Sequence, residues 1–488
     1  MKKLWIWILI GALVLAGVGA AIAFDLAGRK TAFVKPYEHN VNYFYAEEEG
    51  ATRFAVDSAV LSDKLMGRVD SFLSCDGSCG IVRAATGLYR VDKTGIVCIY
   101  PAGVERALIS LDGEKIVFTT ATEVHIYDGP SGETVDIKPE GISGVGSIVV
   151  SPDGNTVGYS VKSGDKYTAF AYENGQSRVL RENAYIVGVS DGAGFYYFVE
   201  PETVSLWYAK GDSVRKLGEN IAGEVEFNRS LTEVMFDMGG VTHCSVKGAA
   251  AKPVIEGASV YSAKARCSSV QGGAAVTSEV KDADTLFGSV FYSYKNDSEG
   301  RAPTVYDVWY VNGNRRETLI ARNAYKFIES ADGGRLSVLM ADGKLYDMKM
   351  GEPKTAKLLG ANISDYSTSG SGTFFCVGRD GRLYYYNGVE GAKAMEIAKS
   401  ASYCIAVSDE VTVFLDGEAN RLYYVKNGYD VQPALDNAAH VEKMGGAVFC
   451  YTAEYLNALG GKVYDVYVSE NGIDWSLAVK GAKKPTSD

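Results

Sequence analysis

The sequence has few histidines and lacks the short motifs of the commonest metal and nucleotide sites. Its 4 histidines are His39, His125, His243 and His440, and no two of them have the paired spacing of a metal site. The zinc motif His-Glu-x-x-His and the phosphate-binding glycine–lysine loop do not occur. We therefore predict no catalytic residue, no metal ligand and no cofactor, and a non-catalytic role is favoured over an enzyme.

Basic residues are outnumbered and form no cluster. The chain has 49 Lys and Arg against 60 Asp and Glu, which gives a net charge of −11. Phosphate backbones are bound by a positive stripe, which this sequence does not have. Nucleic acid is therefore excluded as a partner.

Most of the 8 cysteines do not suggest disulfides. Cys376 and Cys450 occur at the same register of their repeats, where other repeats have a small residue, so we predict two buried thiols. Only Cys75 and Cys79 lie close enough in sequence to pair, and whether they do is left open. No second Cys or His pair accompanies them, so a metal site is not predicted.

The N-terminus predicts export. Lys2 and Lys3 precede Leu4 to Phe24, an uncharged run of 21 residues that would span roughly 31 Å as a helix. A cleaved signal peptide is the alternative, because Ala21-Ile-Ala23 has the small-x-small form of a cleavage site. We expect a single-pass anchor in residues 4–24 with the N-terminus inside, and a membrane-anchored, extracytoplasmic remainder, which is secreted if the segment is cleaved.

A repeat organises the rest of the chain. The tetrapeptide Ser-x-Asp-Gly begins at Ser74, Ser110, Ser151 and Ser330, and looser copies begin at Ser190, Ser230, Ser369 and Ser408. Successive copies are separated by 36 to 41 residues, apart from the interval between Ser230 and Ser330. A fixed period near 40 is the signature of a repeat architecture.

Each repeat contains four β-forming runs separated by Gly, Asp or Pro, here named strands a to d. Strand c carries a Leu–aromatic pair, as in Leu206-Trp207, and strand d ends at an Asn before an apolar residue, as in Asn220-Ile221. We count ten such units from Gly67 to Gly481. Four-stranded units of this length are the blades of a β-propeller, so we predict an all-β fold of one large ring or two smaller rings.

The predicted domains are a signal anchor or signal peptide (1–24), a stalk with two possible extra strands (25–66), the propeller (67–481) and a short tail (482–488). The phrase Ser151-Pro-Asp-Gly154, followed by a Val-x-Tyr strand, resembles the blade of TolB-like, WD-repeat-like bacterial propellers. It is also similar to the blades of prolyl-oligopeptidase-type propellers. The resemblance implies the fold and little else. Such families bind proteins, peptides or glycans, or serve as a gate in front of a hydrolase, and we expect a partner that is a protein, a peptide or a cell-wall glycan.

One unit is longer than the others by about fifteen residues, which are inserted between its strands b and c after Ser278. We predict that ligands bind at the b–c loops, because loops held by a rigid scaffold commonly carry binding residues. The candidate ligand-binding residues in and beside this insertion are Asp282, Asp284, Tyr292, Tyr294, Asp297, Glu299 and Arg301.

Three functions are compatible with these patterns. A non-catalytic binding or scaffold module for a protein, peptide or cell-envelope glycan is favoured, because no catalytic set is recognisable. A propeller enzyme acting on glycans at the channel mouth, as a hydrolase or lyase, is the alternative. The third is a structural component of an envelope assembly.

Overall fold

The computed structural model describes residues 41–482, apart from 46–50, 57–58, 67, 74–78, 111, 229, 257–258, 263–285, 288, 296–304, 331–333, 369–372, 388–392, 409, 445–446 and 458–461. These residues belong to one compact unit, His39–Asp488. Nearly all of the regular structure among them is β-strand. The described helical turns are the 3-10 segments η1 (Asp191–Ala193) and η3 (Pro353–Thr355). The predicted all-β class is confirmed.

The described strands form antiparallel sheets in chain order. The first sheet has three strands, β1 (Val41–Tyr45), β2 (Ala51–Val56) and β3 (Ala59–Met66). Three four-stranded sheets follow: β4 (Arg68–Leu73), β5 (Cys79–Ala84), β6 (Gly87–Asp92) and β7 (Gly95–Tyr100); β8 (Arg106–Ile109), β9 (Lys115–Thr119), β10 (Val124–Asp128) and β11 (Thr134–Ile137); β12 (Gly144–Val150), β13 (Val157–Ser163), β14 (Lys166–Glu173) and β15 (Gln176–Glu182).

The next two four-stranded sheets are β16 (Tyr185–Val189), β17 (Tyr196–Glu200), β18 (Ser205–Lys210) and β19 (Ser213–Gly218), then β20 (Ile221–Phe227), β21 (Glu233–Met238), β22 (Val241–Val246) and β23 (Lys252–Glu256). A seven-stranded sheet contains β24 (Ser259–Ser262), β25 (Ser289–Lys295), β26 (Val305–Val311), β27 (Glu317–Glu329), β28 (Arg335–Met340), β29 (Leu345–Lys349) and β30 (Lys357–Gly360).

The last sheets are β31 (Ile363–Thr368), β32 (Phe374–Gly378), β33 (Leu383–Tyr386) and β34 (Met395–Ala398); β35 (Tyr403–Ala406), β36 (Val411–Asp416), β37 (Arg421–Lys426) and β38 (Asp430–Asp436); and β39 (Ala438–Met444), β40 (Ala447–Thr452), β41 (Tyr455–Leu456), β42 (Lys462–Ser469) and β43 (Ser476–Ala482). Counted from β4, the strands form ten units, because β27 ends one unit and begins the next. The repeat count therefore agrees with the sequence.

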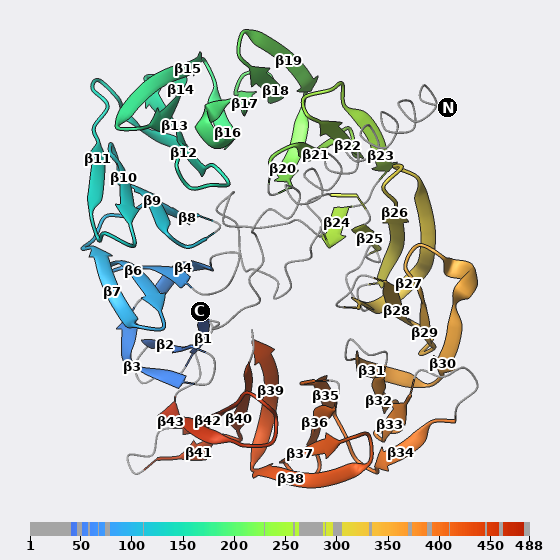
Figure 1. The fold of residues 1–488 in the computed structure, drawn as a ribbon. Helices are drawn as coiled ribbons and strands as arrows, with labels where there is room; N and C mark the ends of the chain where they lie inside the picture. Colours follow the sequence, from blue (N-terminus) through green and yellow to red (C-terminus); the bar gives the residue numbers. More distant parts are fainter. Residues whose placement is uncertain are drawn as a thin grey trace, which may run out of the picture. The chain divides into compact units, whose positions relative to one another are not determined.

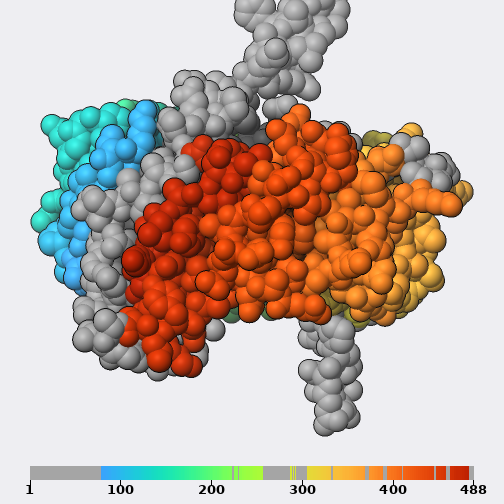
Figure 2. Space-filling model, turned by 90° about the horizontal axis from the view of Figure 1, so that it is seen from below, coloured from blue at the N-terminus to red at the C-terminus, as the bar shows by residue number. Residues whose placement is uncertain are grey.

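These sheets are the blades of a β-propeller. Figure 1 shows them one after another around a ring, with the first strand of each blade inside and the last outside. The core lies between neighbouring blades: Leu108 and Val117 of one blade pack with Val150 and Tyr159 of the next. Figure 2 shows the blades from β31 to β43 packed side by side.

Each blade has two ends with different turns. Because the strands are antiparallel, the a–b and c–d turns lie at one end, here called the a–b rim, and the b–c and d–a connections lie at the other, the b–c rim.

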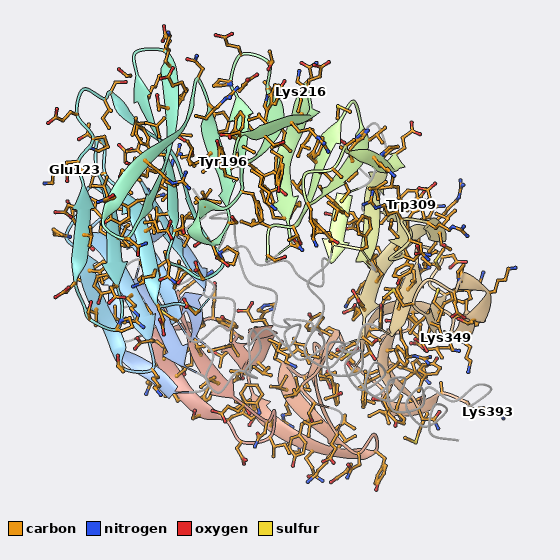
Figure 3. All side chains as sticks on the ribbon, turned by 45° about the horizontal axis from the view of Figure 1, so that its top comes forward. Glu123, Tyr196, Lys216, Trp309, Lys349 and Lys393 are labelled. Atoms are coloured by element: carbon orange, nitrogen blue, oxygen red, sulfur yellow. The ribbon has the colours of Figure 1, made fainter. Side chains whose placement is uncertain are left out.

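In Figure 3, Tyr196 lies between blades, whereas Glu123 and Lys216 lie on the outer side. Tyr196 is accordingly buried.

The Ser-x-Asp-Gly motif closes the a–b turn through its serine. The backbone N–H of Thr156 donates to Ser151 Oγ at 2.9 Å, and Ser151 Oγ donates to Asp153 Oδ1 at 2.6 Å. The backbone of Gly154 has φ +73°, which glycine adopts without a steric penalty. In the blade that begins at β20, Asn228 takes the serine's place and accepts from Glu233 N at 2.8 Å. The structural counterpart is therefore Asn228 and not Ser230.

Neighbouring a–b turns are linked across blades. Asp153 N donates to Asp191 Oδ1 at 3.0 Å, and Gly192 N donates to Thr156 Oγ1 at 2.9 Å. Burial and the nearby charge of Asp153 raise the pKa of Asp191. These two acidic turns therefore dock adjacent blades at the cost of repulsion between the carboxylates of Asp153 and Asp191.

We expect Asp191→Asn to stabilise the protein at pH 7 by less than about 1 kcal/mol, because both side chains contact solvent. The asparagine oxygen can still accept from Asp153 N. A carboxyl whose pKa is raised by folding stabilises at low pH, and that stability is lost as pH rises through its folded pKa. The gain over wild type should vanish by about pH 3, below the ordinary carboxyl pKa. Urea unfolding across this range tests it, and equal stability at pH 7 would refute it.

The Leu–aromatic pairs of strand c have one structural role. Leu88, Leu206, Leu345, Leu383 and Leu422 are completely buried. At each of these pairs the ladder to strand d shifts register between the leucine and the aromatic residue. The signature therefore marks a β-bulge that recurs around the propeller.

In some blades the aromatic residue after the bulge stacks on an aromatic residue of strand b, whereas in others its partner on strand b is a valine or a cysteine. Trp207 stacks on Phe198 with an interplanar angle of 3°, and Phe170 stacks on Tyr159. His125 occupies the same place and stacks on Phe118, and its Nδ1 lies 2.7 Å from Asp136 Oδ1. This explains one scattered histidine as part of the blade.

The asparagines at the ends of strand d turn the chain into the next blade. Asn183, Asn220, Asn323, Asn362 and Asn437 all have φ between +50° and +62°. Asparagine tolerates this left-handed conformation better than most residues. The carbonyl of Asn362 also accepts from Arg379 N at 2.8 Å, which ties the corner to the next b–c turn.

Replacing Asn362 with alanine should therefore destabilise the protein by about 1 kcal/mol, because alanine has a steric penalty in this conformation. Asn362→Gly should be close to neutral, since glycine adopts it readily. Chemical denaturation of the three proteins provides the measurement. Equal destabilisation by alanine and glycine would mean that the side-chain amide, and not the backbone conformation, is responsible.

The expected membrane-anchored location is contradicted, because among residues 41–482, with the gaps given above, no helix is long and apolar enough to cross a membrane. The run Leu4 to Phe24, on which that expectation was based, lies outside the described residues.

Candidate functional site

The residues predicted to bind a ligand mostly lie outside the described part of the chain: Asp282, Asp284, Asp297, Glu299 and Arg301. Tyr292 and Tyr294 lie on β25. The Tyr292 ring is half-buried and packs edge-on against Tyr306, with centroids 5.6 Å apart. A ligand-binding role for this set stays a prediction.

The predicted buried thiols are confirmed. Cys376 and Cys450 are completely buried, and burial raises the pKa of both, that of Cys450 to about 12. Cys79 is buried and accepts from Arg90 Nε at 3.2 Å. Because Cys75 lies outside the described residues, the proposed Cys75–Cys79 pair stays open.

The pentapeptide Gly188 to Gly192 has the Gly-x-Ser-x-Gly spacing of a hydrolase nucleophile, but its geometry differs. In that motif the serine lies on a sharp strand-to-helix turn and is exposed. Ser190 lies instead in the turn between antiparallel β16 and β17, and its Oγ accepts from Phe195 N at 2.9 Å. This serine closes an a–b turn, as Ser151 does.

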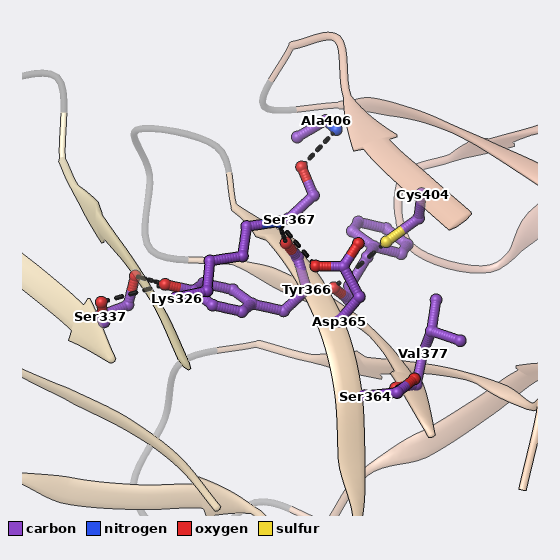
Figure 4. A network of polar contacts seen from close by, with 10 residues as sticks. Lys326, Ser337, Ser364, Asp365, Tyr366, Ser367, Val377, Cys404 and Ala406 are labelled. Atoms are coloured by element: carbon purple, nitrogen blue, oxygen red, sulfur yellow. Dashed lines mark hydrogen bonds and ion pairs between the residues drawn. The ribbon is translucent and has the colours of Figure 1, made fainter. Parts of the chain in front are cut away.

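The innermost strands of three later blades share a polar network, shown in Figure 4. Lys326 Nζ on β27 donates to Asp365 Oδ1 at 2.7 Å and to Tyr366 O at 2.8 Å on β31. Ser367 Oγ accepts from Ala406 N on β35 at 2.7 Å. These polar groups bond to one another across blades, so the network holds blades together.

A groove of about 430 Å³ lies between the blade β16–β19 and the blade β20–β23. Its lining combines two aromatic rings, two hydroxyls, three cations and one glycine: Phe195, Tyr208, Ser213, Thr232, Lys210, Arg215, Lys247 and Gly248. These residues come from the a–b and c–d turns of both blades. The groove therefore opens on the a–b rim.

The floor of the groove is a tyrosine packed against a glycine of the next blade. A Cβ on Gly248 would lie 2.0 Å from Tyr208 Cδ1, so only glycine allows this approach. Arg215 Nη1 donates to Gly248 O at 3.0 Å and bridges the two blades. Burial raises the pKa of the Tyr208 phenol. Tyr208 and Arg215 are thus held in place before any ligand binds.

The same arrangement, which we call a tyrosine seat, occurs at two further blade junctions. A Cβ on Gly351 would lie 2.5 Å from the Tyr310 ring, and one on Gly428 would lie 2.8 Å from the Tyr385 ring. In each seat the residue before the glycine donates its backbone N–H to a carbonyl in the a–b turn of its own blade. The pairs are Lys247 to Thr232, Met350 to Gly334, and Asn427 to Glu410. The seat is therefore a repeated docking device.

The cations of the groove are absent from the other two seats. Strand register places Asn312 and Asn387 where the groove has Lys210. The position of Arg215 is occupied by Thr318 in the second seat and by Met395 in the third. The position of Lys247 is occupied by Met350 in the second seat and by Asn427 in the third. The tyrosine–glycine contact forms at the other two seats without these cations, so the contact itself does not require them.

Lys247 also adopts an unfavourable backbone conformation. Its φ is +50°, and the counterpart in the third seat is Asn427 with φ +52°. Asparagine suits this conformation, whereas lysine has a penalty of about 1 kcal/mol. A residue that breaks a local rule without a packing benefit is a candidate for function.

No carboxylate in the described part of the chain neutralises the charge of the groove. Among the described residues, no carboxylate lies within 4.0 Å of the charged groups of Lys210, Arg215 or Lys247. The nearest acidic residue in sequence is Asp212 in the same turn, and it forms no ion pair with them. A site with three uncompensated cations attracts anions, although the chain as a whole carries −11.

This groove lies on the a–b rim, opposite the long, variable b–c loops at which ligand binding is predicted from the sequence. The turns that line the groove are short, and their residues come from two blades. A usable signal was present: Lys247 stands where another repeat has the turn residue Asn427. This difference between Lys247 and Asn427 becomes apparent only when the two blades are aligned, and strand register provides that alignment.

No family model and no curated protein matches the chain. Solved structures align weakly. The crystal structure of Kluyvelomyces marxianus Hsv2 has 13% identity and a TM-score of 0.31, covering 76% of this chain and 97% of that chain. Porphyromonas gingivalis dipeptidyl peptidase 4 has 10% identity and a TM-score of 0.39, covering 68% and 61%. An oligogalacturonate lyase in complex with manganese has 12% identity and a TM-score of 0.33, covering 75% and 96%. At these values the alignments carry no information on ligand or activity.

Proposed function

We propose that this protein is a non-catalytic binding module of the TolB-like, WD-repeat-like kind, and that it holds an anionic ligand in the groove between β16–β19 and β20–β23. Lys210, Arg215 and Lys247 supply the attraction, and Arg215 supplies the fixed geometry. A protein, a peptide and a glycan are the candidate carriers of the anionic group, in keeping with the partners expected from the sequence.

The observation that supports this function is the comparison of the three tyrosine seats. All three share the tyrosine, the glycine of the next blade, and the backbone hydrogen bond that joins the c–d turn of that next blade to its own a–b turn. Only one has cations at all three variable positions. Positions that are free to vary within a repeated scaffold are where a specific site can develop.

The test is binding to anionic polymers. We expect the protein to bind at least one of poly-L-glutamate, alginate and polyphosphate at low ionic strength, and not neutral dextran, in biolayer interferometry. Binding should weaken as salt is added, because exposed charges are screened. The variant Lys210→Glu/Arg215→Glu/Lys247→Glu should lose at least about tenfold in affinity, equivalent to about 1.4 kcal/mol.

The control variant carries the same change of charge elsewhere: Lys349→Glu/Lys393→Glu/Lys426→Glu. It should bind like wild type. Equal loss in both variants would show that net charge and not the groove controls binding, and absence of binding to every anionic polymer would contradict the proposed function. The alternative, an enzyme acting on glycans, predicts that the protein shortens alginate on incubation.

A further inference from the structure

We infer that the groove recognises a phosphate monoester, a dianion, rather than a carboxylate. This inference rests on the proposed function, because it names the chemical group that the same three cations bind.

The first argument is charge balance. Lys210, Arg215 and Lys247 contribute three positive charges, and no carboxylate of the described residues is paired with them. A single carboxylate would leave about two of these charges uncompensated. A phosphate monoester carries between about −1.5 and −2 near pH 7, which matches the groove more closely.

The second argument is the supply of hydrogen-bond donors. One guanidinium N–H of Arg215 is used by Gly248 O, which leaves about four, and each lysine ammonium offers about three. A carboxylate has two oxygens and accepts about four hydrogen bonds. The three terminal oxygens of a phosphoryl group can use more of these donors. Its tetrahedral shape also suits cations that approach from two blades.

The third argument is the anchoring of Arg215. Its hydrogen bond to Gly248 O ties strand β19 to the c–d turn of the next blade, so the guanidinium is preorganised. Arginine pairs with phosphate through two parallel N–H groups, whereas lysine acts as a point charge. We therefore assign orientation of the phosphoryl group to Arg215, and attraction to Lys210 and Lys247.

The experiment compares three ligands that share a phenyl ring: phenyl phosphate, phenyl sulfate and benzoate. Titration calorimetry on the full chain should give an affinity for phenyl phosphate at least about tenfold above that for benzoate. Phenyl sulfate, which is tetrahedral but singly charged, should be closer to benzoate. Lowering the pH from 7.5 to 5.5 should weaken phenyl phosphate binding several-fold, because the second pKa of a phosphate monoester is near 6.

Two variants locate the effect. Arg215→Gln should lower the affinity for phenyl phosphate about tenfold, whereas Lys426→Gln, at the third tyrosine seat, should leave it unchanged. Phosphoserine and glucose 6-phosphate, each compared with its unphosphorylated form, then distinguish a peptide from a sugar as the source of the group. A preference for one of them identifies the carrier, and equal binding of both still supports the phosphate.

The outcomes separate the two proposals. If benzoate binds as tightly as phenyl phosphate and Arg215→Gln weakens both, the groove is an anion site and the phosphate inference is overturned. If none of the three ligands and none of the anionic polymers binds, the proposed function fails as well. Binding of phenyl phosphate that persists in Arg215→Gln would place the site elsewhere and refute the inference.

Discussion

Replacing Gly248 with alanine is expected to destabilise the protein by about 3 kcal/mol and to abolish binding in the groove. The backbone there has φ +69°, which costs an alanine about 1–2 kcal/mol. The new Cβ would also lie 2.0 Å from Tyr208 Cδ1, and overpacking of this kind costs about 1–3 kcal/mol. Because Tyr208 is the floor of the groove, its displacement also moves the surface on which the cations are arranged.

Gly211→Ala is the matched control, since Gly211 lies in the facing c–d turn with φ +54°, and a Cβ added there would have no neighbour within 4 Å. Gly211→Ala should lower the free energy of unfolding by about 1 kcal/mol, which is the cost of the left-handed backbone conformation alone. Gly351→Ala repeats the test at the second tyrosine seat, where the ring lies 2.5 Å away. Urea unfolding measures all three. If Gly248→Ala costs no more than Gly211→Ala, the tyrosine seat is not a rigid contact.

Much of the blade architecture could be predicted from the sequence because it depends on local chemistry. In the blade from Ala184 to Asn220 the sequence predicts strands over 185–190, 195–199, 205–210 and 214–217. These match β16 to β19 to within one residue at every end. The asparagine corners and the Asp-Gly turns demand unusual φ values, and few residues tolerate them. Such positions can be recognised from a single amino-acid sequence.

Contacts between blades could not be predicted in the same way. The seven-stranded sheet arises because β27 continues through the corner at Asn323, and only the hydrogen bonds on both sides reveal this. The groove could not be predicted for the same reason, because it is formed by contacts between blades. Arg215 and Gly248 are 33 residues apart, and nothing in the sequence states that one donates to the other.

Position in the repeat gives information that residue type alone does not. A lysine in a surface turn is ordinary, and Lys210 or Lys247 alone would suggest nothing. Placed beside Asn387 and Asn427 of an equivalent seat, the two lysines become departures from a common scaffold. Comparing equivalent junctions within one propeller thus replaces part of the information that a set of relatives would supply.

Lys326→Met is expected to destabilise the protein by about 2 kcal/mol. Its ammonium donates to Asp365 Oδ1 and Tyr366 O, and it lies 5.2 Å from the centroid of the Tyr366 ring. Methionine fills similar space but leaves Asp365, whose side chain is only 19% exposed, without its cation. Loss of one partner of a largely buried charge costs more than an exposed pair contributes.

A double-mutant cycle isolates the free energy of the interaction between Lys326 and Asp365. Adding Asp365→Asn to Lys326→Met should restore more than half of the lost stability, because the uncompensated charge is removed. The control is Lys344→Met, since Lys344 pairs with Asp342 at 2.7 Å but both side chains are close to half-exposed. That change should cost less than about 0.5 kcal/mol. If Lys326→Met and Lys344→Met cost the same in urea unfolding, the network of the innermost strands contributes no more than a surface ion pair.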